Sequence, residues 1–227
     1  MAIQRQNPAY RAAHTFIRIV KGEQEMDRLE KQMKFIEELD KNKGIGRQTY
    51  ILAGERKEND AEHMFHLAIM AAVLSEHANE PVDVLKVMTM VLVHDAVEID
   101  AGDTYAYDEE GNVTKREREC KAADRIFHIL PPDQEEYFRG LWEEFEANET
   151  PEAQFANTLD KLQPTMLNHT SGGRAWKEHG VAVSQIYKRN GSTALGSEVL
   201  WKYARENFIE PHVEKPGKPG EIKEDRT

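Results

Sequence analysis

Apolar residues along this chain recur every three or four positions, which is the spacing of one face of an α-helix. The stretch "GEQEMDRLEKQMKFIEELDK" predicts a helix over about 22–41, whose apolar side carries Met26, Leu29, Met33, Phe35 or Ile36, and Leu39. The same periodicity predicts further helices over about 60–77, 81–97, 115–130, 132–147, 150–170, 180–188 and 196–207. No alternating pattern longer than a few residues indicates a strand. The pattern therefore predicts an all-α protein.

Prolines and capping residues mark several of these helix ends. Pro81 suits the first position of a helix, and Thr150 followed by Pro151 suits a capped start. Pro164 has no backbone N–H to donate, and its ring clashes with the preceding turn of a regular helix. We therefore expect the helix to be irregular at 160–164.

The chain reads as a single domain, because it has no internal repeat and no dividing linker. We expect one helical-bundle domain over about 1–210, with its core at about 30–190. The Gly-containing segment 42–59 reads as a connection between helices. The tail at 211–227 is rich in Pro, Gly and charge, so it is expected to be flexible and disordered.

Composition narrows the function classes. With 39% apolar residues the chain can bury a sizeable core, while a net charge of −11 argues against binding nucleic acid or anionic membranes. The longest apolar runs are too short to span a bilayer, and no signal peptide is visible. A single cysteine, Cys120, excludes an internal disulfide and fits a reducing compartment. These features predict a cytoplasmic protein.

The stretch "MVLVHDAVEID" carries an apolar helical run directly into His94, Asp95 and Glu98. Burying these groups costs several kcal/mol unless they are paired or bind a metal. Partners are available, because His63 and Asp160 lie on the apolar sides of two other predicted helices. Two imidazoles and two carboxylates suit Mn, Co, Fe, Ni or Zn better than Mg or Ca. A single His or Asp on a helix is more often structural, so only the whole set of four residues indicates a metal site.

Three pieces in this order resemble the HD-domain phosphohydrolases, named for their His-Asp pair: "ENDAEH" at 58–63, "HDAVEIDAGD" at 94–103 and "LDKLQP" at 159–164. The resemblance covers roughly 30–190 and is nearest to the branch that contains bacterial 5′-deoxynucleotidases. It implies an all-α helical bundle whose metal ligands are His63, His94, Asp95 and Asp160. Between Asp95 and Asp160 the only histidine is His128, so one metal is expected rather than two.

The resemblance also implies roles for residues near these ligands. Glu98 would orient a metal-bound water or take its proton, and Asp103 would lie near the sugar or the scissile phosphate. The alternatives are a surface acid and a turn residue, respectively. Arg56 and Arg47 match substrate-binding arginines of the family, and guanidinium groups suit phosphate. Gln48 stands where the deoxynucleotidases have Trp after that second arginine.

The resulting hypothesis is a metal-dependent phosphohydrolase with one divalent transition metal. It would cleave the phosphomonoester of a nucleoside 5′-monophosphate, as a 5′-nucleotidase does, through attack of a metal-bound water. A homodimer is compatible with the family. The alternatives are a nucleoside polyphosphate or alarmone hydrolase, and a non-catalytic sensor of metal and nucleotide. The acidic residues Glu98 and Asp103 favour an enzyme over a sensor, since pure binding needs no group that activates water.

Overall fold

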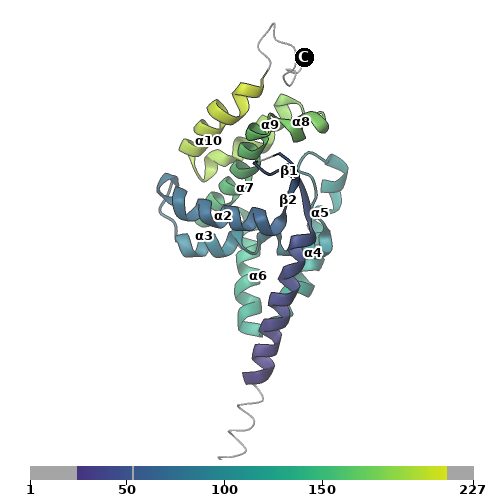
Figure 1. The fold of residues 1–227 in the computed structure, drawn as a ribbon. Coiled ribbons are helices and arrows are strands. Elements are labelled where there is room, and N and C mark those ends of the chain that lie inside the picture. The colour runs from purple at the N-terminus through teal and green to yellow at the C-terminus, as the bar shows by residue number, and fades with distance from the viewer. Residues whose placement is uncertain (1–24, 53, 214–227) are drawn as a thin grey trace, which may run out of the picture.

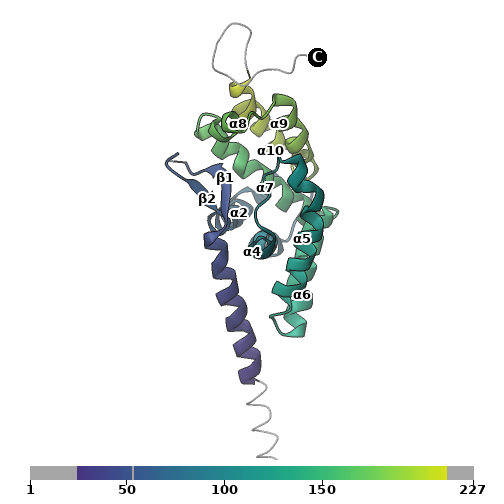
Figure 2. The same cartoon turned by 90° about the vertical axis from the view of Figure 1, so that its right-hand side faces the viewer.

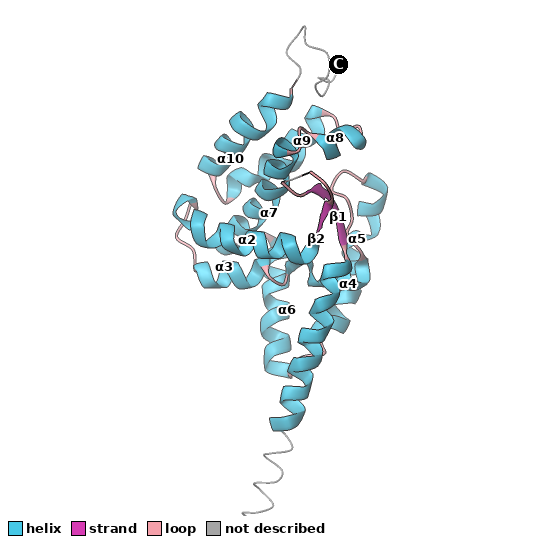
Figure 3. Cartoon of the chain, viewed as in Figure 1, coloured by secondary structure: helices cyan, strands magenta, loops and turns pink. Residues whose placement is uncertain are grey.

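The computed structural model describes residues 25–52 and 54–213, which form a bundle of helices with one small hairpin (Figures 1 and 3). This confirms the predicted all-α class. Most of the tail predicted at 211–227 lies outside the described residues, although Pro211 and His212 belong to a short 3₁₀ helix, η7 (Glu210–His212). Among the described residues, no helix is both long enough and apolar enough to cross a membrane.

The longer helices match most of the predicted ones. They comprise the helical residues 25–39, α2 (Asp60–Leu74), α3 (Val84–Val91), α5 (Glu109–Phe127), α6 (Pro132–Ala147), α7 (Pro151–Thr170), α9 (Val183–Asn190) and α10 (Glu198–Ala204). Shorter turns connect them: η2 (Asp40–Gly44), η3 (Ser75–His77), α8 (Arg174–Glu178), η5 (Gly191–Leu195) and the π-helical η6 (Arg205–Ile209).

Helix α7 lies at the centre of the bundle and packs against α2, α3, α6 and α10 (Figure 1). Its start is the predicted one, because the Thr150 side chain accepts a hydrogen bond from the Ala153 N–H and Pro151 is the first helical residue. Helix α7 continues through Pro164 without ending there. The irregularity expected at 160–164 stays a prediction, because Pro164 has no N–H to donate to the Asp160 carbonyl. Leu159 is fully buried in the core, so the next residue, Asp160, is held at a fixed position beside it.

The helix predicted over 81–97 is broken in the structure. It begins after Asp83, whose side chain accepts a hydrogen bond from the Lys86 N–H, and α3 ends at Val91. A 3₁₀ helix, η4 (His94–Val97), and a short helix, α4 (Glu98–Ala101), follow. At the break, His94 Nδ1 donates to the Val91 carbonyl at 2.8 Å and so satisfies one of the free carbonyls at the end of α3.

The connection at 42–59 contains a hairpin that the hydrophobic pattern did not predict. Strand β1 (Gly46–Tyr50) pairs antiparallel with β2 (Lys57–Asn59). Both strands are short and mostly polar, so they have no alternating apolar signal. The hairpin leads directly into α2, whose first turn is closed by a capping box between Asn59 and Glu62.

The helical residues 25–39 bury only part of their predicted apolar side. Phe35 packs against the rings of Phe127 and Phe138, with centroids 6.4 and 6.0 Å away. Leu39 is partly buried against the same cluster, whereas four other predicted positions on this side are largely exposed: Met26, Leu29, Met33 and Ile36. Figure 2 shows this helix extending beyond the rest of the bundle, which explains why so few partners reach it.

Candidate metal centre

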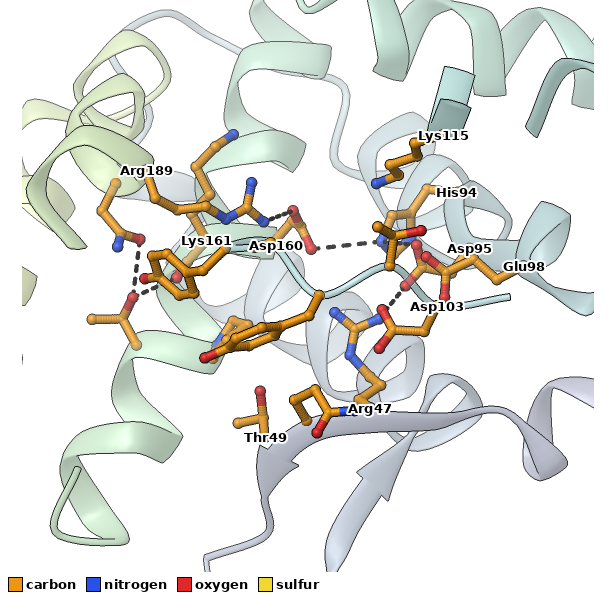
Figure 4. A pocket seen from close by; sticks show the side chains of 18 of the residues that line it. Arg47, Thr49, His94, Asp95, Glu98, Asp103, Lys115, Asp160, Lys161 and Arg189 are labelled. Atoms are coloured by element: carbon orange, nitrogen blue, oxygen red, sulfur yellow. Dashed lines mark hydrogen bonds and ion pairs between the residues drawn. The ribbon is translucent and has the colours of Figure 1, made fainter. Parts of the chain in front are cut away.

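Four side chains from three segments converge where α2, η4 and α7 meet. His63 Nε2 lies 3.1 Å from Asp160 Oδ1, and His94 Nε2 lies 3.7 Å from the same oxygen. Asp95 completes the group, with Oδ1 3.1 Å from His94 Nε2 and Oδ2 3.8 Å from His63 Nε2. The ligand-type atoms of the two histidines and Asp160 all lie within 4.8 Å of one another. Figure 4 shows His94, Asp95 and Asp160 at the wall of one pocket.

Both imidazoles are oriented by hydrogen bonds at Nδ1. His63 Nδ1 bonds to Gln163 Oε1 at 3.0 Å, and His94 Nδ1 bonds to the Val91 carbonyl. A proton on each Nδ1 leaves the Nε2 lone pairs directed toward the Asp160 carboxylate. His94 Nε2 is buried and has no hydrogen-bond partner within the described part of the chain. Such an arrangement fits a metal bound by two imidazole nitrogens and carboxylate oxygens.

The charges around these atoms favour a cation. Burial lowers the pKa of His94, but the carboxylates of Asp95 and Asp160 outweigh it and raise that pKa well above its usual value. Burial would raise the pKa of Asp160, yet the two histidines hold it well below its usual range. His63 differs, because burial and then the Arg47 charge lower its pKa to about 4. Neutral His63 can therefore offer a lone pair at physiological pH.

A second group of acids lies directly behind Asp95. Oxygens of Asp60, Asp95 and Glu98 lie within 4.8 Å of one another, and all three residues are buried. Burial, followed by the charge of Asp95, raises the pKa of Asp60 to about 7 and that of Glu98 well above its usual value. Glu98 Oε2 has no hydrogen-bond partner in the described residues. Glu98 thus stands beside the metal-type ligands as a carboxyl group that readily holds a proton.

Arg47, one of the two predicted substrate-binding arginines, reaches this acidic group from β1. Its Nη1 lies 2.7 Å from Asp95 Oδ2 and 3.4 Å from Asp60 Oδ1, and only 12% of its side chain is exposed. It also lines the pocket, where Figure 4 shows it beside Asp103. The positive charge of Arg47 therefore offsets the negative charge of the buried acids, while part of its side chain still lines the cavity.

Arg56, the other predicted arginine, is placed differently. Its guanidinium forms a bidentate ion pair with the Glu62 carboxylate, with N–O distances of 2.6 and 2.8 Å. Its side chain is 55% exposed, and it is not among the described residues that line the pocket. This position gives no support to the expected contact with phosphate. Asp103, by contrast, does line the pocket.

Three further cations line the pocket that the sequence reasoning did not assign: Lys115, Lys161 and Arg189. Arg189 Nη2 lies 3.7 Å from Asp160 Oδ2, and Lys115 Nζ lies 3.4 Å from Glu119 Oε1. Figure 4 shows Arg189 on the Asp160 side of the pocket and Lys115 on the His94 side. Although burial lowers the pKa of Lys115, nearby carboxylates, Glu119 first, raise it overall, so this ammonium stays charged. Nothing in their spacing along the chain relates Lys115 or Arg189 to the His-Asp pair.

A buried polar chain supports His63 from behind. Gln163 is fully buried; its Oε1 faces His63 Nδ1 and its Nε2 donates to Glu58 Oε2 at 2.8 Å. Burial raises the pKa of Glu58 to about 7, although the Arg47 charge opposes this. The sequence does contain a signal for Gln163, since it follows Asp160 by three residues and so shares its helix face.

The cavity beside the candidate ligands is small and polar, with a volume of about 100 Å³. A wider pocket of about 450 Å³ adjoins it. The two share three wall residues: Gln48, Tyr105 and Tyr107.

Comparison with known proteins places this geometry in a family. The family model described as "HD domain" matches residues 39–201, which is most of the chain. The chain belongs to the HD-domain family. The core expected at about 30–190 stays a prediction.

Solved and curated HD-domain proteins resemble the chain to different extents. The crystal structure of a predicted metal-dependent phosphohydrolase from Magnetospirillum magnetotacticum MS-1 is 48% identical, with a TM-score of 0.76, covering 79% of this chain and 90% of that one. The 5′-deoxynucleotidase HDDC2 of Bos taurus is 32% identical over 110 residues, which is 48% of this chain and 52% of that protein. HDDC2 of Danio rerio is 28% identical over 145 residues, 63% and 70% of the two chains. The chain thus spans about half the length of the first of these curated relatives.

Proposed function

We propose that this HD-domain protein is a metal-dependent phosphohydrolase that cleaves the phosphomonoester of a nucleoside 5′-monophosphate. The observation that carries the proposal is the convergence of two inward-facing histidine Nε2 atoms with the carboxylates of Asp95 and Asp160, beside the buried Glu98. The likeness to 5′-deoxynucleotidases supports the substrate class. The small volume of the cavity favours one phosphate group over a polyphosphate chain.

One divalent transition metal would be held by His63, His94, Asp95 and Asp160. Such an ion lowers the pKa of a bound water and polarises a phosphoryl oxygen. Other residues of the chain would bind the phosphate, handle the attacking water and balance the charge. Among them, Lys115 and Arg189 line the same cavity as two cationic groups from opposite sides, where they can bind the phosphate oxygens.

Glu98 is the residue we assign to the attacking water. A carboxylate whose pKa is raised accepts a proton more readily, and burial followed by the neighbouring acids raises the pKa of Glu98. Asp103 lines the cavity near Arg47 and would contact the sugar or the scissile phosphate. Arg47 holds Asp95 in place and compensates the charge of the acidic group.

The test is phosphate release from nucleoside monophosphates by metal-supplemented protein, comparing wild type with Glu98→Gln. The substitution keeps the size of the side chain but removes its basic carboxylate, so kcat should fall by about 10²–10⁴-fold. Metal content should stay at the wild-type value, because no proposed ligand changes. Glu149→Gln, at an exposed position on the loop before α7, is the matched control and should retain wild-type kcat.

Two outcomes would contradict the proposal. If wild-type protein with Mn, Co, Fe, Ni or Zn releases no phosphate from any nucleoside monophosphate, the assigned substrate class is wrong. If Glu98→Gln loses its metal, Glu98 is a ligand rather than the group that handles water.

A further inference from the structure

The cavity beside the candidate metal ligands is too small for a whole nucleotide. Its volume of about 100 Å³ suits a phosphate group, whereas pockets that enclose a complete small ligand have volumes of roughly 300–1,000 Å³. The adjoining pocket, at about 450 Å³, has the missing volume. Since Gln48, Tyr105 and Tyr107 line both spaces, a ligand can extend from one into the other along a common wall.

The wider pocket has an aromatic lining. The Tyr105 ring lies 4.4 Å from the ring of His179 and 5.3 Å from that of Tyr107, measured between centroids. The interplanar angles of 39° and 64° mean that these rings form an uneven surface rather than a closed stack. Flat heteroaromatic groups stack on such side chains, and the contact tolerates different bases because each has a π-face.

The polar groups of this pocket are directed by neighbouring contacts. Gln185 Oε1 accepts from the Ala182 N–H at 2.9 Å, and Gln48 Oε1 accepts from Lys57 Nζ at 2.5 Å. His179 Nε2 lies 3.2 Å from the same Gln48 oxygen. With their oxygens engaged, both glutamines keep amide N–H groups that can be donated to a ligand. Ring nitrogens and carbonyl oxygens at the edge of a nucleobase are acceptors of this kind.

We propose that the wider pocket is the nucleobase subsite. It stacks the base on Tyr105 and His179 while the 5′-phosphate occupies the small cavity and the sugar passes the shared wall. This inference rests on the proposed function and adds to it, because it makes the base, and not only the phosphate, a source of binding energy.

The experiment compares a substrate that carries a base, a 2′-deoxynucleoside 5′-monophosphate, with one that has no base, 2-deoxyribose 5-phosphate. For each, kcat/KM is measured with wild type, Tyr105→Leu, Tyr105→Phe and His179→Leu. Tyr137→Leu changes an exposed tyrosine on α6, outside both pockets, and serves as the control. Loss of one stacking contact should lower the preference for the nucleotide over the sugar phosphate by about 5–150-fold in each Leu variant. Tyr105→Phe keeps the ring and should keep the preference.

Particular results would overturn the subsite. Equal losses of kcat/KM on both substrates would mean that Tyr105 and His179 act only through the fold. Wild-type kcat/KM on both substrates in the Leu variants would place the base elsewhere. If wild type cleaves neither substrate, the proposed function fails, and calorimetric binding of the nucleotide then decides the subsite. In that case Tyr105→Leu must weaken binding by a similar factor while Tyr137→Leu does not.

Discussion

Replacing Gln163 by Leu should weaken metal binding without changing any of the four proposed ligands. The Gln163 amide is the sole protein group hydrogen-bonded to His63 Nδ1 among the described residues, at 3.0 Å. It also donates to Glu58 at 2.8 Å, so its two ends hold the imidazole and a buried acid at once. Leu has a similar size but can do neither. Without the acceptor, the ring of His63 loses the bond that fixes its tautomer and orientation.

The magnitude follows from these two lost bonds. Removing a group that orients a metal-bound histidine typically costs about 10–100-fold in metal affinity. The metal-free protein should be destabilised as well, because a buried donor or acceptor left unpaired costs about 1–3 kcal/mol. With His63 Nδ1 and Glu58 Oε2 both orphaned, a loss of at least about 2 kcal/mol is expected. For a domain of this size, that lowers the melting temperature by roughly 4–8 °C.

Metal affinity is measured by competition with a chromophoric chelator, and stability by calorimetry of the chelated protein. Gln163→Glu is the informative companion variant. It restores an acceptor for His63 but places a carboxylate against Glu58, so it should recover metal affinity while remaining unstable. Gln154→Leu, on the same helix but with its amide at the exposed surface, is the control.

Wild-type metal affinity in folded Gln163→Leu would refute the reasoning, since the orientation of His63 would then not depend on this amide. Equal loss of affinity in the Leu and Glu variants would also count against it. That result would indicate general damage to the helix rather than loss of the acceptor.

The remaining predictions concern single residues. Elemental analysis of purified Asp160→Ala should find no stoichiometric metal. Chelation should lower the melting temperature of wild type but not that of the variant. Retained metal would remove Asp160 from the ligand set. In chelated protein, Glu58→Gln should gain stability relative to wild type as the pH rises from about 4.5 to 7. Burial raises the pKa of Glu58 to about 7, so the folded state holds the proton more tightly than the unfolded one, and that contribution is lost as the pH rises through this window. The gain, at most roughly 3 kcal/mol, is measured by urea unfolding at several pH values, and a pH-independent difference would contradict it. Arg56→Ala should change KM for a nucleoside monophosphate by less than about twofold, because Arg56 is exposed and paired with Glu62; a large rise in KM would show that it moves into the site.

The sequence by itself determined the helical class and the identity of the residues that converge. Helical periodicity is a local property, so it located most helices between 60 and 170 but missed the break after Val91. The capped start at Thr150 and Pro151 was correct in detail. Buried ionisable groups need partners, which pointed to His63 and Asp160 as candidates, and the resemblance to the HD-domain phosphohydrolases implied the ordered set of His63, His94, Asp95 and Asp160. The four side chains lie close together in space, while their role as metal ligands stays a prediction.

Only the tertiary structure decided which other side chains share the cavity. Lys115 and Arg189 stand at no characteristic distance in sequence from the His-Asp pair, so only the packing of their helices brings them to the cavity. The local pattern likewise could not tell which of Arg47 and Arg56 reaches the site. In the structure Arg47 is buried against Asp95, whereas Arg56 is exposed. The physical reason is that periodicity reports which residues share a face of one helix. Which faces meet depends on how several helices bury their apolar sides together, and that is decided over the whole chain.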